Sequence, residues 1–181
     1  MVLNQNSSLV SRFSETKISM GRYQFILQTD GSLVLYTLHY PIADYMVAYW
    51  YTQTINTGYQ VIFGQSGNVY ITARNGTILD RISSSGVPVR KFYQRLTLDC
   101  DGVLRHYVFP KSNKSAGGRS MRWSVNFYIP PDICPRVGGT RGRGVCGLNS
   151  LCTSEVIEGL IVAVGMGTLC GKSERNAKMS G

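Results

Sequence analysis

Residues 27–36 read LQTDGSLVLY, and this stretch decides the fold. It consists of an apolar strand, a tight turn at Asp30-Gly31 and a second, alternating strand. Glycine adopts a positive φ without steric cost, so a two-residue Asp-Gly turn predicts a β-hairpin. The pattern recurs about every 35 residues, as FGQSGNVYI at 63–71 and LDCDGVLRHY at 98–107. This recurrence predicts three small antiparallel sheets with pseudo-threefold symmetry, which bury their apolar faces against one another.

The sequence around the hairpins supports an all-β domain over residues 1–128, with a core that begins near residue 20. In the stretch from 22 to 28, Tyr23, Phe25 and Leu27 fall on one strand face, which we expect to be buried. Asn75-Gly76 predicts a further hairpin. No helix longer than two turns is expected in this region. Pro130-Pro131 cannot continue a sheet interior and marks the end of the domain.

For three other side chains, the neighbouring residues predict whether the side chain is buried or exposed. Trp50 and Trp123 lie in strand-like aromatic runs and are expected in the core. His106 alternates with its neighbours on a strand and is expected at the surface.

The composition agrees with one packed domain. Of 181 residues, 43% are hydrophobic and 16% charged, and 11 tyrosines and 20 glycines favour strands and tight turns over helices. The formal net charge of +9 is compatible with nucleic acid, an anionic surface or polysaccharide, or simple solubility. Between Lys111 and Arg143 the basic residues form no unbroken run and are not interleaved with aromatic residues. We therefore interpret this region as a solvated loop and expect no nucleic-acid partner.

Four of the five cysteines lie in the last third of the chain. Their surroundings are rich in Gly, Pro and Arg, which predicts a small disulfide-dependent unit made in an oxidising compartment. A zinc site is the alternative, but the sequence has no C-x-x-C pair and its histidines are distant, so we expect no metal. Cys100, beside a hairpin turn, is expected to be a free thiol. The cysteines are Cys100, Cys134, Cys146, Cys152 and Cys170.

Three sequons, at Asn6, Asn75 and Asn113, fit a secreted protein. No signal sequence is recognisable at the N-terminus. The apolar stretch at 156–170 contains Glu158 and three glycines and is shorter than a membrane span, which needs about 18–20 apolar residues. We interpret the chain as one that lacks parts at both ends.

Polar side chains at alternate positions surround the first turn. Residues two apart on a strand face the same side, so Gln28, Asp30, Ser32 and Tyr36 are expected to converge on one surface. Their amide, carboxylate and hydroxyl groups could bind the hydroxyls of a hexose, while Val34 offers an apolar contact. Such a shallow site predicts weak affinity.

No pattern in the sequence indicates catalysis. The Gly-rich loop, V-A-I-K and H-R-D segments of protein kinases are absent. His39 and His106 are the only histidine bases, and neither lies in a recognisable nucleophile frame. Asp99 and Asp101 are too close on one strand to flank a glycosidic bond. We expect neither enzyme activity nor a cofactor.

Two stretches carry a resemblance to a known family. The pattern Gln28-x-Asp30-x-Ser32-x-Val34-x-Tyr36 resembles the Q-x-D-x-N-x-V-x-Y mannose motif of bulb-type lectins. Cys134, with GVCGLNSLC at 144–152, resembles the opening of an EGF-like module. Together with the segment at 92–103, they resemble the ectodomain of plant G-type lectin S-receptor-like serine/threonine kinases.

The resemblance implies a β-prism II domain followed by a truncated EGF-like segment at 129–152, at the cell surface or outside the cell. It implies a mannose-type glycan as ligand, a Cys134–Cys152 bridge, and a partner for Cys146, for which Cys170 is the candidate. The stretch 153–181 matches nothing in the family and is expected to be flexible.

The sequence departs from the lectin motif in all three repeats. Ser32 replaces Asn in the first. The second repeat has Gly64, Ser66, Asn68, Tyr70 and Thr72 at the motif positions. The third has Asp99, Asp101, Val103, Arg105 and Tyr107, of which Asp99, Asp101 and Tyr107 form a weaker candidate site. We interpret the second and third repeats as hairpins retained for folding.

Two functions therefore remain open. One is a carbohydrate-binding module that recognises mannose-type sugars through its first repeat. The other is an interaction fragment of a receptor ectodomain, which packs against other ectodomains and binds no sugar.

Overall fold

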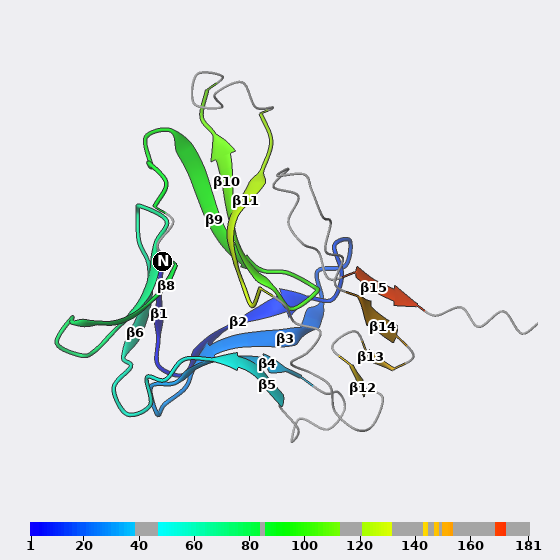
Figure 1. The fold of residues 1–181 in the computed structure, drawn as a ribbon, viewed down its shortest axis with the longest axis horizontal. Coiled ribbons are helices and arrows are strands. Elements are labelled where there is room, and N and C mark those ends of the chain that lie inside the picture. Colours follow the sequence, from blue (N-terminus) through cyan, green and yellow to red (C-terminus); the bar gives the residue numbers. More distant parts are fainter. Residues whose placement is uncertain are drawn as a thin grey trace, which may run out of the picture.

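The computed structural model describes residues 1–38, 47–83, 86–112 and 121–131, and the backbone of four further short strands. These residues form no helix. The strands before residue 132 form three antiparallel sheets that meet around a shared interior (Figure 1). The all-β, three-sheet prediction is confirmed.

The first sheet has the order β2 (Ser7–Arg12), β3 (Met20–Leu27), β4 (Leu33–Thr37) and β5 (Val47–Tyr51). The second has the order β1 (Val2–Asn4), β6 (Gln60–Phe63), β7 (Val69–Thr72) and β8 (Ile78–Ser83). The third has the order β11 (Ser124–Ile129), β10 (Leu104–Pro110) and β9 (Phe92–Leu98). Two short pairs follow: β12 (Arg143–Gly144) with β13 (Gly147–Leu148), and β14 (Ser150–Thr153) with β15 (Leu169–Lys172).

Each of the three sheets contributes one apolar face to the common core. Tyr23, Phe25 and Leu27 of β3 are buried together, as their alternation predicted. Leu3 of β1 also belongs to the core, because β1 pairs with the edge of the second sheet. The other buried hydrophobic members are Leu33, Leu35, Tyr49, Val61, Val69, Ile71, Leu98, Leu104 and Ile129.

The hairpin turns at Gly31, Gly67, Gly76 and Gly102 share one geometry. In the first, the Gln28 N–H donates to the Ser32 carbonyl (2.9 Å) and the Gly31 N–H to the Gln28 carbonyl (3.0 Å). Each loop has three residues rather than the expected two, with a single positive φ of 83–85° at its glycine. A type I turn followed by a left-handed glycine has this pattern.

Two expectations about single side chains are wrong. Trp123 is 41% exposed, because its ring contacts Phe109 on the outer side of the third sheet and does not join the core cluster. His106 is fully buried, because the turn of the second sheet packs onto β10. Trp50 is half-buried and packs against the core.

Hydrogen bonds around His106 join the second and third sheets. The Gln94 Nε2 donates to the carbonyls of Gln65 (3.3 Å) and Val87 (3.1 Å), which fixes the amide orientation. Its Oε1 therefore accepts from the His106 Nε2–H (2.9 Å). The His106 Nδ1, 3.2 Å from the Asn126 Nδ2, is then an acceptor. Both contacts suit the neutral imidazole.

The free energy of unfolding should fall as the pH is lowered from 7.5 to about 5.5. Burial lowers the pKa of His106, so the unfolded chain binds the proton more tightly. The stabilisation is complete above the unfolded pKa of about 6.5 and is lost as the pH falls below it. Urea unfolding at several pH values measures this dependence. His106→Gln should flatten this pH dependence, and an unchanged slope in that variant would contradict the assignment.

Candidate functional site

The five motif residues of the first repeat lie around one hairpin of the first sheet. Val34 is only 4% exposed, yet it does not belong to the core cluster, so it lies on the outer face. Cross-strand pairing of Ile26 with Val34 and Gln24 with Tyr36 places Tyr36 on the same face. Val34 and Tyr36 therefore share the outer face, as their alternation predicted, whereas Asp30 lies in the three-residue turn.

Two hydrogen bonds hold the motif side chains. The Gln28 Nε2 donates to the Tyr36 hydroxyl (3.1 Å), which links the two ends of the motif. The Asp30 Oδ1 accepts from the Ser32 N–H (2.8 Å) and closes the turn. Asp30 is exposed, while Gln28, Ser32 and Tyr36 are half-buried. The arrangement is a shallow surface with a carboxylate at its rim.

Tyr51 extends this surface and was not found from the sequence. It pairs with Val34 across β4 and β5 and is 66% exposed. The register shifts so that Tyr49 is an extra residue between Ala48 and Trp50. This bulge turns Tyr49 inward, where its hydroxyl donates to the Gly102 carbonyl (2.6 Å). Simple alternation would give Tyr49 and Tyr51 the same environment, so no local signal separates them.

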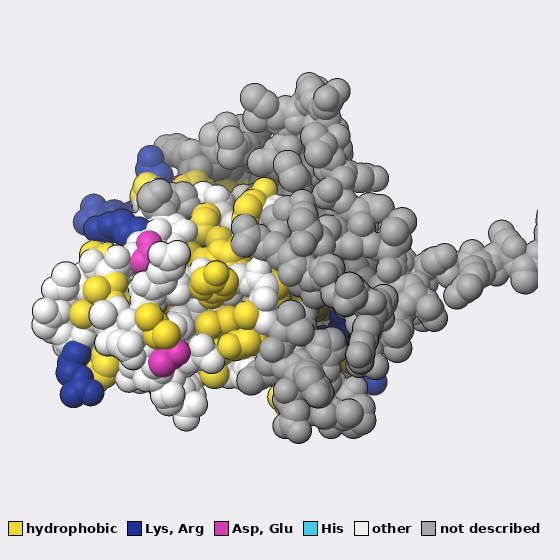
Figure 2. All heavy atoms as spheres, turned by 60° about the horizontal axis from the view of Figure 1, so that its bottom comes forward, with side chains coloured by type: hydrophobic (Ala, Val, Ile, Leu, Met, Phe, Trp, Pro, Cys, Tyr) yellow, Lys and Arg dark blue, Asp and Glu magenta, His cyan; other side chains and the backbone are white. Residues whose placement is uncertain are grey.

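Figure 2 shows the face that lies at the bottom of Figure 1, where the first sheet is. Hydrophobic side chains gather in the middle of the described surface, with acidic groups close by. Apolar area next to a carboxylate is the combination that a hexose requires.

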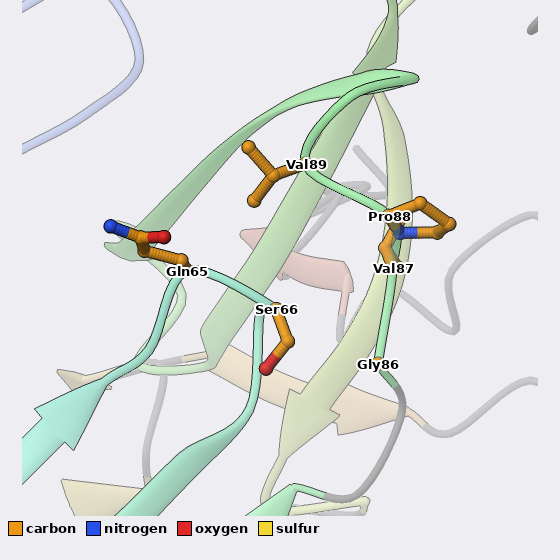
Figure 3. A pocket seen from close by; sticks show the side chains of 6 residues that line it. All are labelled: Gln65, Ser66, Gly86, Val87, Pro88 and Val89. Atoms are coloured by element: carbon orange, nitrogen blue, oxygen red, sulfur yellow. The ribbon is translucent and has the colours of Figure 1, made fainter.

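The second repeat lacks a carboxylate. The Asn68 Nδ2 donates to the Ser66 Oγ (3.0 Å), whereas the buried Asn68 Oδ1 has no hydrogen-bond partner among the described residues. A hollow of about 420 Å³ lies between this turn and residues 86–89 (Figure 3). Val87, Pro88 and Val89 line it together with Gln65, Ser66 and Gly86. The hollow is open and mainly apolar, and it offers no charged group.

The third repeat has its carboxylates occupied by an internal cation. The Arg105 guanidinium donates to the Asp99 Oδ2 (2.8 Å) and to both oxygens of Asp101 (2.8 and 2.6 Å). The Tyr107 hydroxyl also donates to the Asp99 Oδ2 (2.6 Å). Arg105 stands at the motif position that Val34 has in the first repeat. Asp99, Asp101 and Tyr107 do come together, but Arg105 fills the space between them.

These contacts raise the pKa values of Arg105 and Tyr107. Burial alone lowers the pKa of Arg105, but the hydrogen bonds and charges of Asp101 and Asp99 outweigh it and raise that pKa. Burial, then the hydrogen bond to Asp99, raises the pKa of Tyr107. At neutral pH Arg105 therefore keeps its charge and Tyr107 keeps its proton.

Comparison with known proteins identifies the relatives of this chain. The G-type lectin S-receptor-like serine/threonine-protein kinase LECRK2 of Oryza sativa subsp. indica is 39% identical over 155 residues, which cover 85% of this chain. LECRK3 of the same plant is 37% identical over 155 residues. The chain is homologous to a segment of the G-type lectin S-receptor-like kinases. The resemblance found in the sequence is confirmed.

This homology covers only part of each relative. The chain spans 19% of the length of LECRK2 and LECRK3. The kinase RLK1 of Arabidopsis thaliana is 29% identical over 164 residues, with 83% of this chain and 18% of that kinase covered. No protein-family model matches the chain.

Two solved lectin structures are similar to this homologue of the receptor kinases. A Marasmius oreades lectin matches with a TM-score of 0.44 and 16% identity over 71% of this chain and 89% of its own. A monomeric mannose-binding lectin from Gastrodia elata matches with a TM-score of 0.43 and 21% identity over 71% of this chain and 96% of its own.

The remaining predicted sites are only partly described. Asn6 and Asn75 are exposed, as glycosylation requires. Cys152 of β14 lies opposite Cys170 of β15 in the backbone register. Cys100 is a free cysteine. Asn113, Cys134 and Cys146 lie outside the described residues, as does most of 153–181.

No group of metal-binding side chains occurs within the part of the chain that the structure describes. In the same part, no helix has the length and apolar character needed to cross a membrane.

Proposed function

We propose that this chain is a carbohydrate-binding module that recognises mannose-type hexoses on the outer face of its first sheet, at the cell surface or outside the cell. The observation that carries the proposal is the hydrogen bond between Gln28 and Tyr36, because it gathers both ends of the motif on one face beside Asp30. The name "lectin" in the homologous kinases supports it.

The surface offers complementary chemistry to a hexose. The Asp30 carboxylate accepts hydroxyl donors through the oxygen that the turn does not use. Gln28 and Ser32 supply further polar groups, and the exposed ring of Tyr51, beside the almost buried Val34, supplies an apolar contact for the sugar's C–H face. Because Arg105 occupies the third repeat, we infer a single, weak mannose-type site per chain.

Asp30→Asn should abolish retention on mannose-agarose while the domain stays folded. The amide oxygen of Asn still accepts the Ser32 N–H, so the turn survives, but the charged acceptor is lost. Hydrogen bonds to charged groups contribute about 1.5–3 kcal/mol, so the Kd for methyl mannoside should rise about tenfold or more. Calorimetry measures the Kd.

Asn75→Ala is the matched control. The Asn75 Oδ1 accepts the Thr77 N–H (3.0 Å) in a turn of the same geometry on the second sheet. Removing the Asn75 side chain weakens a turn that lies away from the sugar site. Retention on mannose-agarose should therefore stay unchanged. Ser32→Asn restores the family motif and should strengthen retention. If neither the natural chain nor Ser32→Asn binds mannose, the interaction fragment that binds no sugar is the better description.

A further inference from the structure

The outer face of the third sheet presents aromatic rings and cations that the first-sheet site does not use. Cross-strand pairing sets Tyr93 beside Phe109 and Arg95 beside Tyr107. Trp123, just before β11, contacts Phe109 with ring centroids 5.5 Å apart. We call this surface the cation–aromatic face; its members are Tyr93, Arg95, Tyr107, Phe109, Lys111 and Trp123.

Aromatic rings hold both cations of this face. The Arg95 guanidinium lies 4.8 Å from the Tyr107 ring centroid and 4.5 Å from that of Trp123. The Lys111 ammonium lies 4.8 Å from the Tyr93 ring centroid. Such contacts use the faces of the rings and position the charge without a carboxylate.

The positive charge of the face is not neutralised by the described residues. Their only salt bridges join Arg105 to Asp99 and Asp101. Both carboxylates lie in the turn between β9 and β10 and already accept hydrogen bonds from Arg105. Arg95 and Lys111 therefore present N–H donors to an external anion.

We propose that the cation–aromatic face binds acidic oligosaccharides built from uronic acid units. Exposed rings, such as Tyr93 (58%) and Trp123 (41%), offer flat apolar area to the C–H faces of sugars. Arginine and lysine bind carboxylates through strong, charge-assisted hydrogen bonds. A neutral sugar would leave both cations without a partner.

The surface continues into a hollow of about 320 Å³ at the junction with the second sheet. Tyr93 and Lys111 line this hollow, together with Gln65 and Gln94. The hollow provides room for a further sugar unit next to Lys111. A single-stranded nucleic acid fits less well, because it requires a longer track of cations and a ring for each successive base.

Calorimetry with an oligogalacturonate, and with its neutral methyl ester of equal length, tests the proposal on the full chain. The acid form should bind at least about tenfold more tightly than the ester, and added salt should weaken it. Arg95→Gln should weaken binding about tenfold, through the lost charge-assisted contact. The tryptophan fluorescence change on binding should disappear in Trp123→Phe.

Arg74→Gln is the matched control, because Arg74 also stacks on a ring, 5.2 Å from the centroid of Tyr59, but on the second sheet. Arg74→Gln should leave the binding of the oligogalacturonate unchanged. Asp30→Asn should also leave it unchanged, which distinguishes this site from the mannose site. Equal binding of acid and ester, equal loss in Arg74→Gln and Arg95→Gln, or tighter binding of a single-stranded oligonucleotide would each overturn the proposal.

Discussion

Replacing Arg105 with methionine should lower the free energy of unfolding by about 3–5 kcal/mol. The Arg105 side chain is 9% exposed and makes three short contacts to Asp99 and Asp101, whose side chains are 23% and 19% exposed. Without the guanidinium, two partly buried carboxylates face each other with no cation. Removing one partner of a buried ion pair costs more than the pair contributes, because the remaining charge is uncompensated. Urea denaturation measures the loss.

Two further variants show whether the charge or the packing is responsible. Asp99→Asn and Asp101→Asn, combined with Arg105→Met, should recover most of the lost stability, since no unpaired charge remains. Arg105→Lys should recover only a part, because an ammonium cannot reproduce the forked contact to both oxygens of Asp101. If Arg105→Met alone is as stable as the natural chain, the ion pairs of Arg105 do not stabilise the fold. In that case Arg105 also does not block the third-repeat site.

Gly67→Ala should cost about 2–5 kcal/mol, against about 1–2 kcal/mol for Gly76→Ala. Both glycines have the same left-handed conformation, with φ of 83° and 85°. A Cβ on Gly76 would meet no atom within 4 Å, so only the backbone penalty applies there. A Cβ on Gly67 would collide with the Gln94 Oε1 and approach the His106 Cε1 to 2.6 Å. The difference between the costs of Gly67→Ala and Gly76→Ala therefore measures the contact between the second and third sheets.

Thermal and urea unfolding of the two variants measures both costs. In a Gln94→Ala background the difference between them should shrink, because one of the colliding groups is gone. Equal costs in the natural background would mean that the network around His106 relaxes easily and does not define how the two sheets meet.

The sequence alone is sufficient to predict the hairpins of this protein and the buried face of β3. The Asp30-Gly31, Ser66-Gly67 and Asp101-Gly102 pairs predict the hairpins, because only glycine takes the left-handed conformation of each turn at low cost. The period of two along β3 identifies its buried face. The same period places Val34 and Tyr36 on one face of β4. These are short-range properties, which depend on residues a few positions apart.

Which sheet faces are covered, and which repeats keep an accessible candidate site, depends on the tertiary structure. His106 is buried because a turn from another sheet packs on it, whereas Trp123 contacts Phe109 outside the core cluster and stays partly exposed. Tyr51 reaches the candidate sugar site through a bulge at Tyr49, and Arg105 closes the third repeat from within. Alternation along a strand separates its two sides, but it carries no information about what packs against each side. That depends on segments distant in the chain, and their positions are fixed only when the three sheets close around one core.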